Sequence, residues 1–330
     1  MYSTTAISKN SKLSGRIVGT HQRLDQAARK ALAYHLPRGK YFPASKEIVH
    51  FEGIRGPDGL KRKSPGVDEP SHMLAPEPTA DVSEPTVNSS ESTGTIETAN
   101  AAERLEDSSP ANATGHEHLD QRSVLTLIQD HHWNLVRALK QKNDVRAAFE
   151  AAWMAHMLTD GLTPAHHYPL SQVQDELMTD KEMMRVFGQP IKGVMHGRSM
   201  LETLRNNWLY WGAGGHMSKH IAYEYGVAMI AATLPPKSFI PDIKPSDLED
   251  TNIEHIFDKT LELVKNLKMY DRFCRDGWTT DLALQTKEIL LPEIVKAVTL
   301  GWYSAAAEAY NIRPKSLSKP NRASKEPHEN

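Results

Sequence analysis

The chain has 330 residues, 24% of them charged, and a formal net charge of −2 when histidine is counted as neutral. This length allows a substantial buried core, and a net charge near zero argues against general polyanion binding or long-range electrostatic steering. The single cysteine, Cys274, excludes an internal disulfide and a thiolate metal cluster. The unusual feature of the composition is histidine, with sixteen unevenly placed residues.

The first twenty residues contain no apolar run long enough for a secretory signal, and no later segment approaches the length of a membrane span. We therefore expect a cytoplasmic protein, with secretion by another route left open. The sequence gives no sign of an obligate protein partner.

Residues 1–73 are expected to form the N-terminal part of a helical domain. Leucine and alanine recur every fourth residue in HQRLDQAARKALAYHL, which predicts an amphipathic helix over residues 21–36, closed by Pro37 and Gly39. Glycine and proline punctuate residues 50–73, so we expect a loop there without regular structure. The basic run LKRKSPG in this loop is either a solvated surface or a contact for an anionic substrate.

Residues 74–120 are rich in Pro, Ser, Thr, Glu and Asn and contain almost no large apolar side chains. Such a segment cannot bury enough surface to offset its chain entropy. We interpret it as a disordered insertion that interrupts the helical domain.

Residues 121–311 are expected to be the main helical part of the same domain, followed by a flexible basic tail at 312–330. Apolar periodicity predicts helices over 122–142, 144–160, 171–187, 200–212, 216–234, 252–273 and 282–310. Strand signals are few, so the predicted fold class is all-α.

Chemistry concentrates at the end of the helix predicted over 144–160. His156 and Asp160 lie four residues apart and therefore on one helix face. Gly161 ends the helix, Pro164 prevents its renewal, and His166 follows where the chain turns back. The helix end and the turn can thus present all three donors to one point.

A second group lies on the helix predicted over 216–234, where His216, His220 and Glu224 follow each other at four-residue spacing. Imidazole and carboxylate donors without cysteine suit zinc or a similar divalent ion. Pairs of this kind are more often solvated surface pairs. However, the helix bearing His156 is apolar around most of its circumference, and a metal would supply the countercharge that a buried carboxylate requires.

The string His156-x3-Asp160-x3-Pro164-x-His166 resembles the central motif of the all-helical zinc-dependent phospholipase C fold, which single-strand-specific nucleases share. The resemblance implies that His156 and Asp160 bind a first zinc, that Asp160 also reaches a third, and that His166 binds a second.

His220 and Glu224 match the HxxxE pair with which this family completes its second site. Asp58 and His72 have the spacing of the Asp and His that complete the first, and His21 resembles a histidine that serves the third. The matching residues follow the family's order through most of the chain outside the insertion. Three departures are the lack of any tryptophan before Trp133, where the family has an N-terminal one, a longer interval from His166 to His220, and the insertion directly after His72.

The implied function is hydrolysis of a phosphodiester or phospholipid by metal-activated water, with two or three zinc ions and with Asp58 as general base. The substrate is a phosphate ester, either phospholipid or nucleic acid. Two other functions stay open: a non-catalytic metalloprotein whose ions are structural, and a metal-free interaction scaffold.

Several residue assignments also stay open. Asp68 competes with Asp58 as a ligand, and His216 competes with His220. His167 is either a supporting hydrogen-bond donor, a phosphate contact or a solvent-facing loop residue. The aromatic residues near GAGG could stack on a base or contact an acyl chain, although helical spacing favours the core; they are Trp208, Tyr210 and Trp211.

Overall fold

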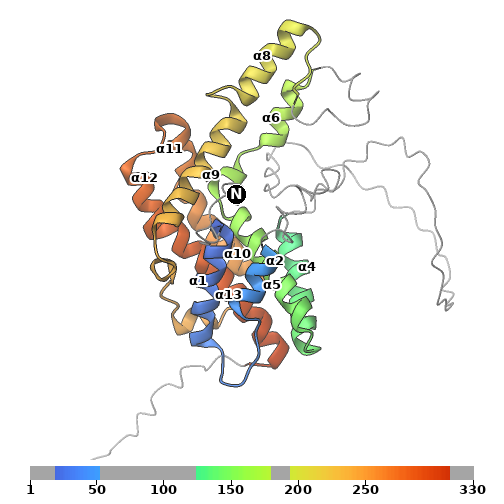
Figure 1. Cartoon of the computed structure of the whole chain (residues 1–330), viewed down its shortest axis with the longest axis vertical. Coiled ribbons are helices and arrows are strands. Elements are labelled where there is room, and N and C mark those ends of the chain that lie inside the picture. Colours follow the sequence, from blue (N-terminus) through green and yellow to red (C-terminus); the bar gives the residue numbers. More distant parts are fainter. Residues whose placement is uncertain (1–18, 53–123, 180–193, 313–330) are drawn as a thin grey trace, which may run out of the picture. The chain divides into compact units, whose positions relative to one another are not determined.

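The computed structural model describes residues 19–52, 124–179 and 194–312, and within these ranges every regular element is a helix (Figure 1). The predicted all-α class is therefore confirmed for this part of the chain. The helices are α1 (Thr20–His35), α2 (Ser45–Glu52), α4 (Val124–Lys140), α5 (Asp144–Gly161), α6 (Leu170–Leu177), α8 (Met200–Trp211), α9 (His216–Thr233), α10 (Ile253–Asn266), α11 (Met269–Asp276), α12 (Thr280–Gln285) and α13 (Leu291–Tyr310). The predicted insertion and tail lie outside the described residues, as do Asp58, Asp68 and His72.

Two helices, α5 and α13, form the centre of the bundle. Every residue from Ala151 to Gly161 in α5 is buried, and so is every residue from Ala297 to Ala307 in α13. The two helices contact each other, and the Trp302 indole N–H donates a buried 2.9 Å hydrogen bond to the carbonyl oxygen of Ala151. A helix that is apolar on all sides must be covered on all sides, which explains why these two are central.

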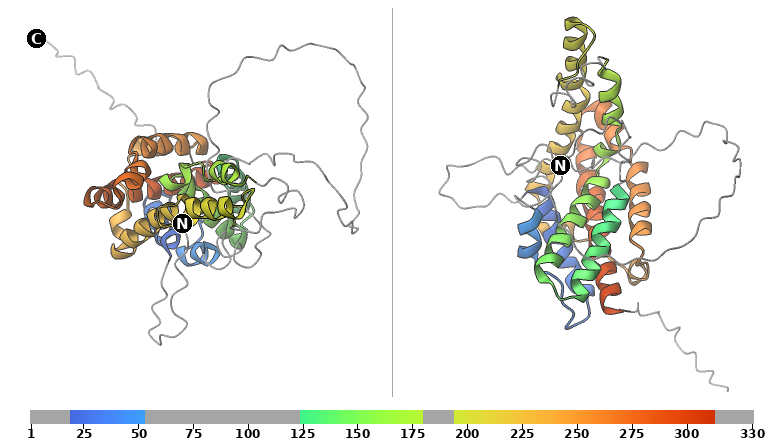
Figure 2. Two further views of the ribbon diagram at one scale, coloured as in Figure 1. Left: turned by 90° about the horizontal axis from the view of Figure 1, so that it is seen from above. Right: turned by 90° about the vertical axis from the view of Figure 1, so that its right-hand side faces the viewer.

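The remaining bundle helices cover this pair. Helix α4 packs along α5 and α13, α10 also packs on both α4 and α13, and α1 packs on α13 and α2. The first, middle and last described helices therefore lie side by side, as the blue, green and red ribbons of Figure 2 show. The stripe predicted for α1 is confirmed, because Leu24, Ala28 and Leu32 are fully buried.

Several local signals determine where helices begin and end. The Asn143 side chain accepts a hydrogen bond from the Arg146 backbone N–H, which caps α5. The single helix predicted over 252–273 is divided into α10 and α11, because Lys268 adopts a left-handed conformation with φ of 48°. The predicted helix over 282–310 contains a π-helical turn at Thr286–Leu290, just before Pro292 near the start of α13.

Helix α2 corrects the prediction of an irregular segment from residue 50 onward, since it continues to Glu52. It packs on α5 and α1. Ile48 is its buried apolar anchor, and Glu52, its last residue, is buried although charged. An eight-residue helix shows too little periodicity for the sequence to reveal it.

Helices α6 and α8 pack on each other (Figure 1) around a small apolar cluster separate from the main core. The cluster consists of Leu170, Met178, Met195 and Tyr210. None of the helices in the described ranges combines the length and the hydropathy needed to cross a bilayer.

Candidate metal centre

The end of α5 and the turn that follows it deliver three polar side chains into the bundle. His156 and Asp160 lie on one face of α5 and are 0% and 1% exposed. A 3-10 turn, Pro164–His167, follows directly and buries His166. The Thr163 hydroxyl donates to the carbonyl oxygen of Thr159, which ties this turn to the end of the helix.

A first group combines His156 and Asp160 with His21 of α1. The His21 and His156 rings are stacked, with centroids 4.2 Å apart and planes 12° from parallel. Asp160 faces the same edge of both rings: its oxygens lie 3.3 Å from Nε2 of His21 and 3.2 Å from Nε2 of His156. The three side chains are arranged so that they could hold a metal ion between them. The resemblance to the phospholipase C fold implied that His21 serves a third site that shares Asp160. The structure brings His21 and His156 together at one group.

Glu52 closes the opposite edge of the stacked histidines. Its Oε1 lies 2.7 Å from Nδ1 of His156 and 3.7 Å from Nδ1 of His21. Asp25, one turn after His21 on α1, is also buried. The sequence analysis did not single out either carboxylate.

A second group contains His166, His220 and Glu224. Glu224 Oε1 lies 2.7 Å from Nε2 of His166 and 3.1 Å from Nε2 of His220. All three side chains are buried, and they too could hold an ion. His220 and Glu224 come from the inner face of α9, where the predicted spacing places them on adjacent turns.

Charge compensation determines the protonation of these groups. Burial by itself raises the pKa of Asp160, but positive charges, among them the histidines of both groups, hold it well below its usual value. Burial likewise raises the pKa of Glu224, but positive charge together with hydrogen bonds from His166 and His220 brings it well below its usual range. Both carboxylates therefore favour the anionic form.

Burial and neighbouring charges also shift the pKa values of two histidines and of Asp25, in different directions. Burial lowers the pKa of His156, yet Glu52 and Asp160 raise it well above its ordinary value. The pKa of His220 is lowered, chiefly by burial. Burial and the charge of Glu52 raise the pKa of Asp25.

The donor set fits a divalent metal. Nε2 of His21, which lies 3.3 Å from an oxygen of Asp160, has no hydrogen-bond partner among the described residues. Buried polar atoms without partners are costly, and a bound cation relieves that cost at nitrogen and carboxylate ligands. Imidazole and carboxylate donors without thiolate suit zinc and related ions.

Other histidines named in the sequence analysis have structural partners. The His216 ring stacks on Tyr168 and its Nδ1 lies 2.8 Å from the Tyr168 hydroxyl, so it does not join the second group. His167 donates from Nε2 to the carbonyl oxygen of Gly161, and burial lowers its pKa to about 4. It therefore fastens the turn in its neutral form.

The aromatic residues near GAGG divide between the core and the surface. Tyr210 is buried as expected for a core residue, whereas Trp208 and Trp211 are exposed. His131 contacts the buried carboxylate of Glu150, and His50 is exposed.

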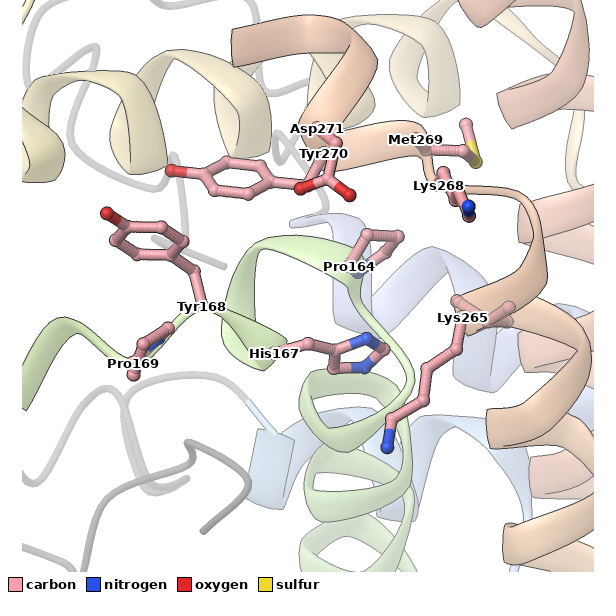
Figure 3. A pocket seen from close by; sticks show the side chains of 10 residues that line it. Pro164, His167, Tyr168, Pro169, Lys265, Lys268, Met269, Tyr270 and Asp271 are labelled. Atoms are coloured by element: carbon pink, nitrogen blue, oxygen red, sulfur yellow. The ribbon is translucent and has the colours of Figure 1, made fainter. Parts of the chain in front are cut away.

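A cavity of about 290 Å³ lies between the turn Pro164–His167 and the chain around the start of α11 (Figure 3). Its lining includes His167 and Tyr168 from the turn, and Lys265 and Lys268 from the segment before α11. None of the six grouped side chains lines it, so a ligand in this cavity would not contact them.

Comparison with known proteins does not extend this description, because no protein-family model, curated protein or solved structure matches the chain. What the chain establishes by itself is an all-helical fold, in the residues described, that buries two histidine-carboxylate groups able to bind metal ions.

Proposed function

We propose that this chain is a zinc-dependent phosphoesterase related to the zinc-dependent phospholipase C and single-strand-specific nuclease fold. The observation that supports it most is the pairing of two buried His/His/carboxylate groups, with three of the six side chains supplied by the continuous segment from His156 to His166. Neighbouring cation sites are the usual arrangement for hydrolysing phosphate esters.

In this proposal His21, His156 and Asp160 hold one ion, and His166, His220 and Glu224 hold a second. Asp58 and His72, outside the described residues, would add ligands to the first, and a third ion that shares Asp160 remains part of the proposal. Bound zinc supplies Lewis acidity, which polarises a phosphoryl oxygen and acidifies a bound water.

The protein's own residues prepare the site for this chemistry. Glu52 accepts a hydrogen bond from Nδ1 of His156, so Nε2, on the Asp160 side of the ring, is the atom that would bind an ion. The buried face of α5 excludes bulk water and keeps the local dielectric low, so fixed charges act strongly. Asp58 would accept a proton at a carboxylate oxygen as general base. Phospholipid and nucleic acid are the candidate substrates.

The burial of all six ligands, each 6% exposed or less, favours a second candidate function. Ions enclosed in this way could serve to fasten α1, α5 and α9 together without catalysis, as structural zinc sites do.

One experiment distinguishes these functions. The untagged full-length protein is analysed for zinc per chain, and hydrolysis of bis(4-nitrophenyl) phosphate is assayed before chelation, after chelation and after zinc is restored. We expect at least two zinc ions per chain and hydrolysis that is lost and regained with zinc. Zinc at that stoichiometry with no hydrolysis of this ester, of phospholipid or of single-stranded nucleic acid would favour the structural role. A protein that binds no metal would contradict both candidates.

A further inference from the structure

Helix α8 buries polar side chains and exposes apolar ones, the reverse of an ordinary surface helix. Its inward side contains Asn206, whose amide donates to the carbonyl oxygen of Leu177 at the end of α6. The amide of Asn207, next along the chain, pairs with both the N–H and the carbonyl oxygen of Met195. Polar groups therefore hold α8 in place, and its apolar side chains are free to face solvent.

The outward side of α8 is large, apolar and aromatic. Helical spacing places five exposed residues on this side: Met200 (81% exposed), Leu201 (80%), Leu204 (60%), Trp208 (71%) and Trp211 (42%). Single exposed apolar residues are ordinary on a protein surface, but a contiguous row of this size indicates a binding surface.

Helix α9 also exposes apolar side chains on the face turned away from the metal groups. Ile221, Tyr225 and Met229 follow each other at four-residue spacing and are 37%, 57% and 47% exposed. The opposite, inner face of the same helix supplies His220 and Glu224 to the second metal group. We call the eight exposed residues of α8 and α9 the outer strip.

Positive charges outnumber negative ones on α8, on α9 and in the segment just before α8. Between residues 194 and 229 the basic residues are Arg198, Arg205 and Lys219, and the acidic ones are Glu202 and the buried Glu224. The Glu202 carboxylate accepts a hydrogen bond from the backbone N–H of Arg198, at the start of α8. This local excess of positive charge contrasts with the chain's overall charge of −2.

We propose that the outer strip docks on the surface of a phospholipid bilayer that contains anionic lipid. Tryptophan with leucine and methionine on one helix face, and basic residues beside them, is the composition of helices that lie in the membrane interface. The strip is formed by the outer sides of two helices, so it can enter the headgroup region without a complementary groove. The flanking arginines and lysine match the phosphate charge of the lipids.

Docking uses the outer faces of α8 and α9 and needs no metal, so it is separate from the proposed hydrolysis. Binding can be measured by flotation with vesicles, and hydrolysis of a soluble phosphodiester can be measured without a membrane. Failure of one proposal therefore leaves the other to its own test.

The test is flotation of the full-length protein, as purified, with vesicles of phosphatidylcholine alone or of phosphatidylcholine with about 30% phosphatidylglycerol, which present a negative surface. We expect binding to the mixed vesicles, reduced roughly tenfold or more by Leu204→Glu and by Trp208→Glu, because each places a charge in the interface. Trp133→Glu is the matched control, since Trp133 is 57% exposed on α4, outside the strip. Arg205→Gln should weaken binding about fivefold, and only to the anionic vesicles.

The far-ultraviolet circular dichroism of each variant should match the wild type, because the replaced side chains are largely exposed. Absence of vesicle binding by the wild type would overturn the proposal, as would equal losses in Trp133→Glu and Trp208→Glu. Sedimentation of the wild type and of Leu204→Glu tests whether the strip is instead a contact between two copies of the chain. A dimer that Leu204→Glu dissociates, together with no vesicle binding, would show this and contradict docking on lipid.

Discussion

The stacked pair of His21 and His156 lies between two carboxylates, Asp160 at one edge and Glu52 at the other. If metal is bound on the Asp160 side, Glu52 fixes the ring orientation and the tautomer of His156 from behind. Its influence on metal binding would then be exerted through a histidine, without contact with the ion.

Glu52→Gln tests this positioning role. The amide keeps the size of the side chain but loses the negative charge that holds Nδ1–H, so we expect zinc affinity to fall about tenfold to a hundredfold. Competition with a chelator of known affinity measures this change. Glu262→Gln is the control, because Glu262 is exposed on α10 and should leave the affinity unchanged. Equal affinities for the wild type and Glu52→Gln would contradict the role.

Asp160→Asn tests the ligand assignment itself. Asp160 contacts both histidines of the first group, so loss of its charge should lower the zinc content per chain by at least one ion. His131→Ala removes a closer histidine-carboxylate contact, with Glu150, which belongs to neither group. It should affect stability and leave the zinc content intact, and similar zinc losses in the two variants would refute the assignment.

His132 should make stability depend on pH. It is buried with its ring 2.9 Å from the Ser304 hydroxyl, and burial lowers its pKa. The unfolded chain therefore binds a proton more readily, beginning below the ordinary histidine pKa of about 6.5. The contribution of neutral His132 is complete above this pH and is lost as the pH falls toward the lowered value.

The free energy of unfolding of the zinc-free protein is measured between pH 5 and 7, a range that includes the ordinary histidine pKa of about 6.5. Wild type should lose stability on acidification more steeply than His132→Gln. Parallel curves would show that His132 does not contribute.

Among the elements, α9 depends on close packing against Trp278. The Trp278 ring stacks on Tyr223, and its N–H donates to the carbonyl oxygen of Ala222. A Cβ atom at Gly226 would lie 2.1 Å from this indole. The tryptophan can therefore hold its place only beside a glycine.

Gly226→Ala should reduce stability by about 1–2 kcal/mol, because displacement of Trp278 outweighs the gain in helix propensity of about 1 kcal/mol. Chemical denaturation of the zinc-free protein measures the difference. Gly214→Ala is the matched control, since a Cβ there meets no atom within 4 Å. A Gly226→Ala variant as stable as the control would show that Trp278 can move without cost.

The sequence predicted most helices because long amphipathic or apolar periods leave a clear signal, as in α1, α5 and α9. It missed α2, which is short, and the break at Lys268, because lysine gives no sign of a left-handed conformation. It did not distinguish the outward apolar side of α8 from a core-facing side, since periodicity shows that a face exists and not what covers it.

In the candidate site, too, the sequence predicted what local spacing determines and missed what depends on packing between helices. His156 with Asp160, and His220 with Glu224, are four residues apart, so helix geometry alone places each pair on one face. Glu52 joins the first group only through packing of α2 on α5, a contact that no local pattern reveals. Asp25 did leave a signal, four residues after His21. The placement of Asp58 and His72 stays a prediction.

In the molecule as a whole, the two groups connect helices from distant parts of the chain. The first joins α1 to α5, and the second joins the turn after α5 to α9. A ligand that binds only the folded state stabilises it, by about 2.7 kcal/mol when its concentration is 100 times its dissociation constant. Metal bound here would therefore stabilise the entire bundle.

Removal of zinc by a chelator should accordingly lower Tm, by roughly 5–10 °C per site at that saturation. Differential scanning calorimetry with and without added zinc measures the shift, and Tm should rise with zinc concentration. The Asp160→Asn variant should show a smaller rise than wild type. A Tm that does not respond to zinc in the wild type would contradict binding by the native fold.

The turn Pro164–His167 follows α5 so closely that only five residues separate Asp160 from His166. The first belongs to one metal group and the second to the other, and both are embedded in the same rigid piece of backbone. The number of residues between them therefore sets the distance between the two groups. Exchanging Leu162 for another apolar residue leaves this number unchanged, whereas inserting or deleting one residue changes it. The length of this segment is therefore more tightly constrained than the identity of its apolar side chains.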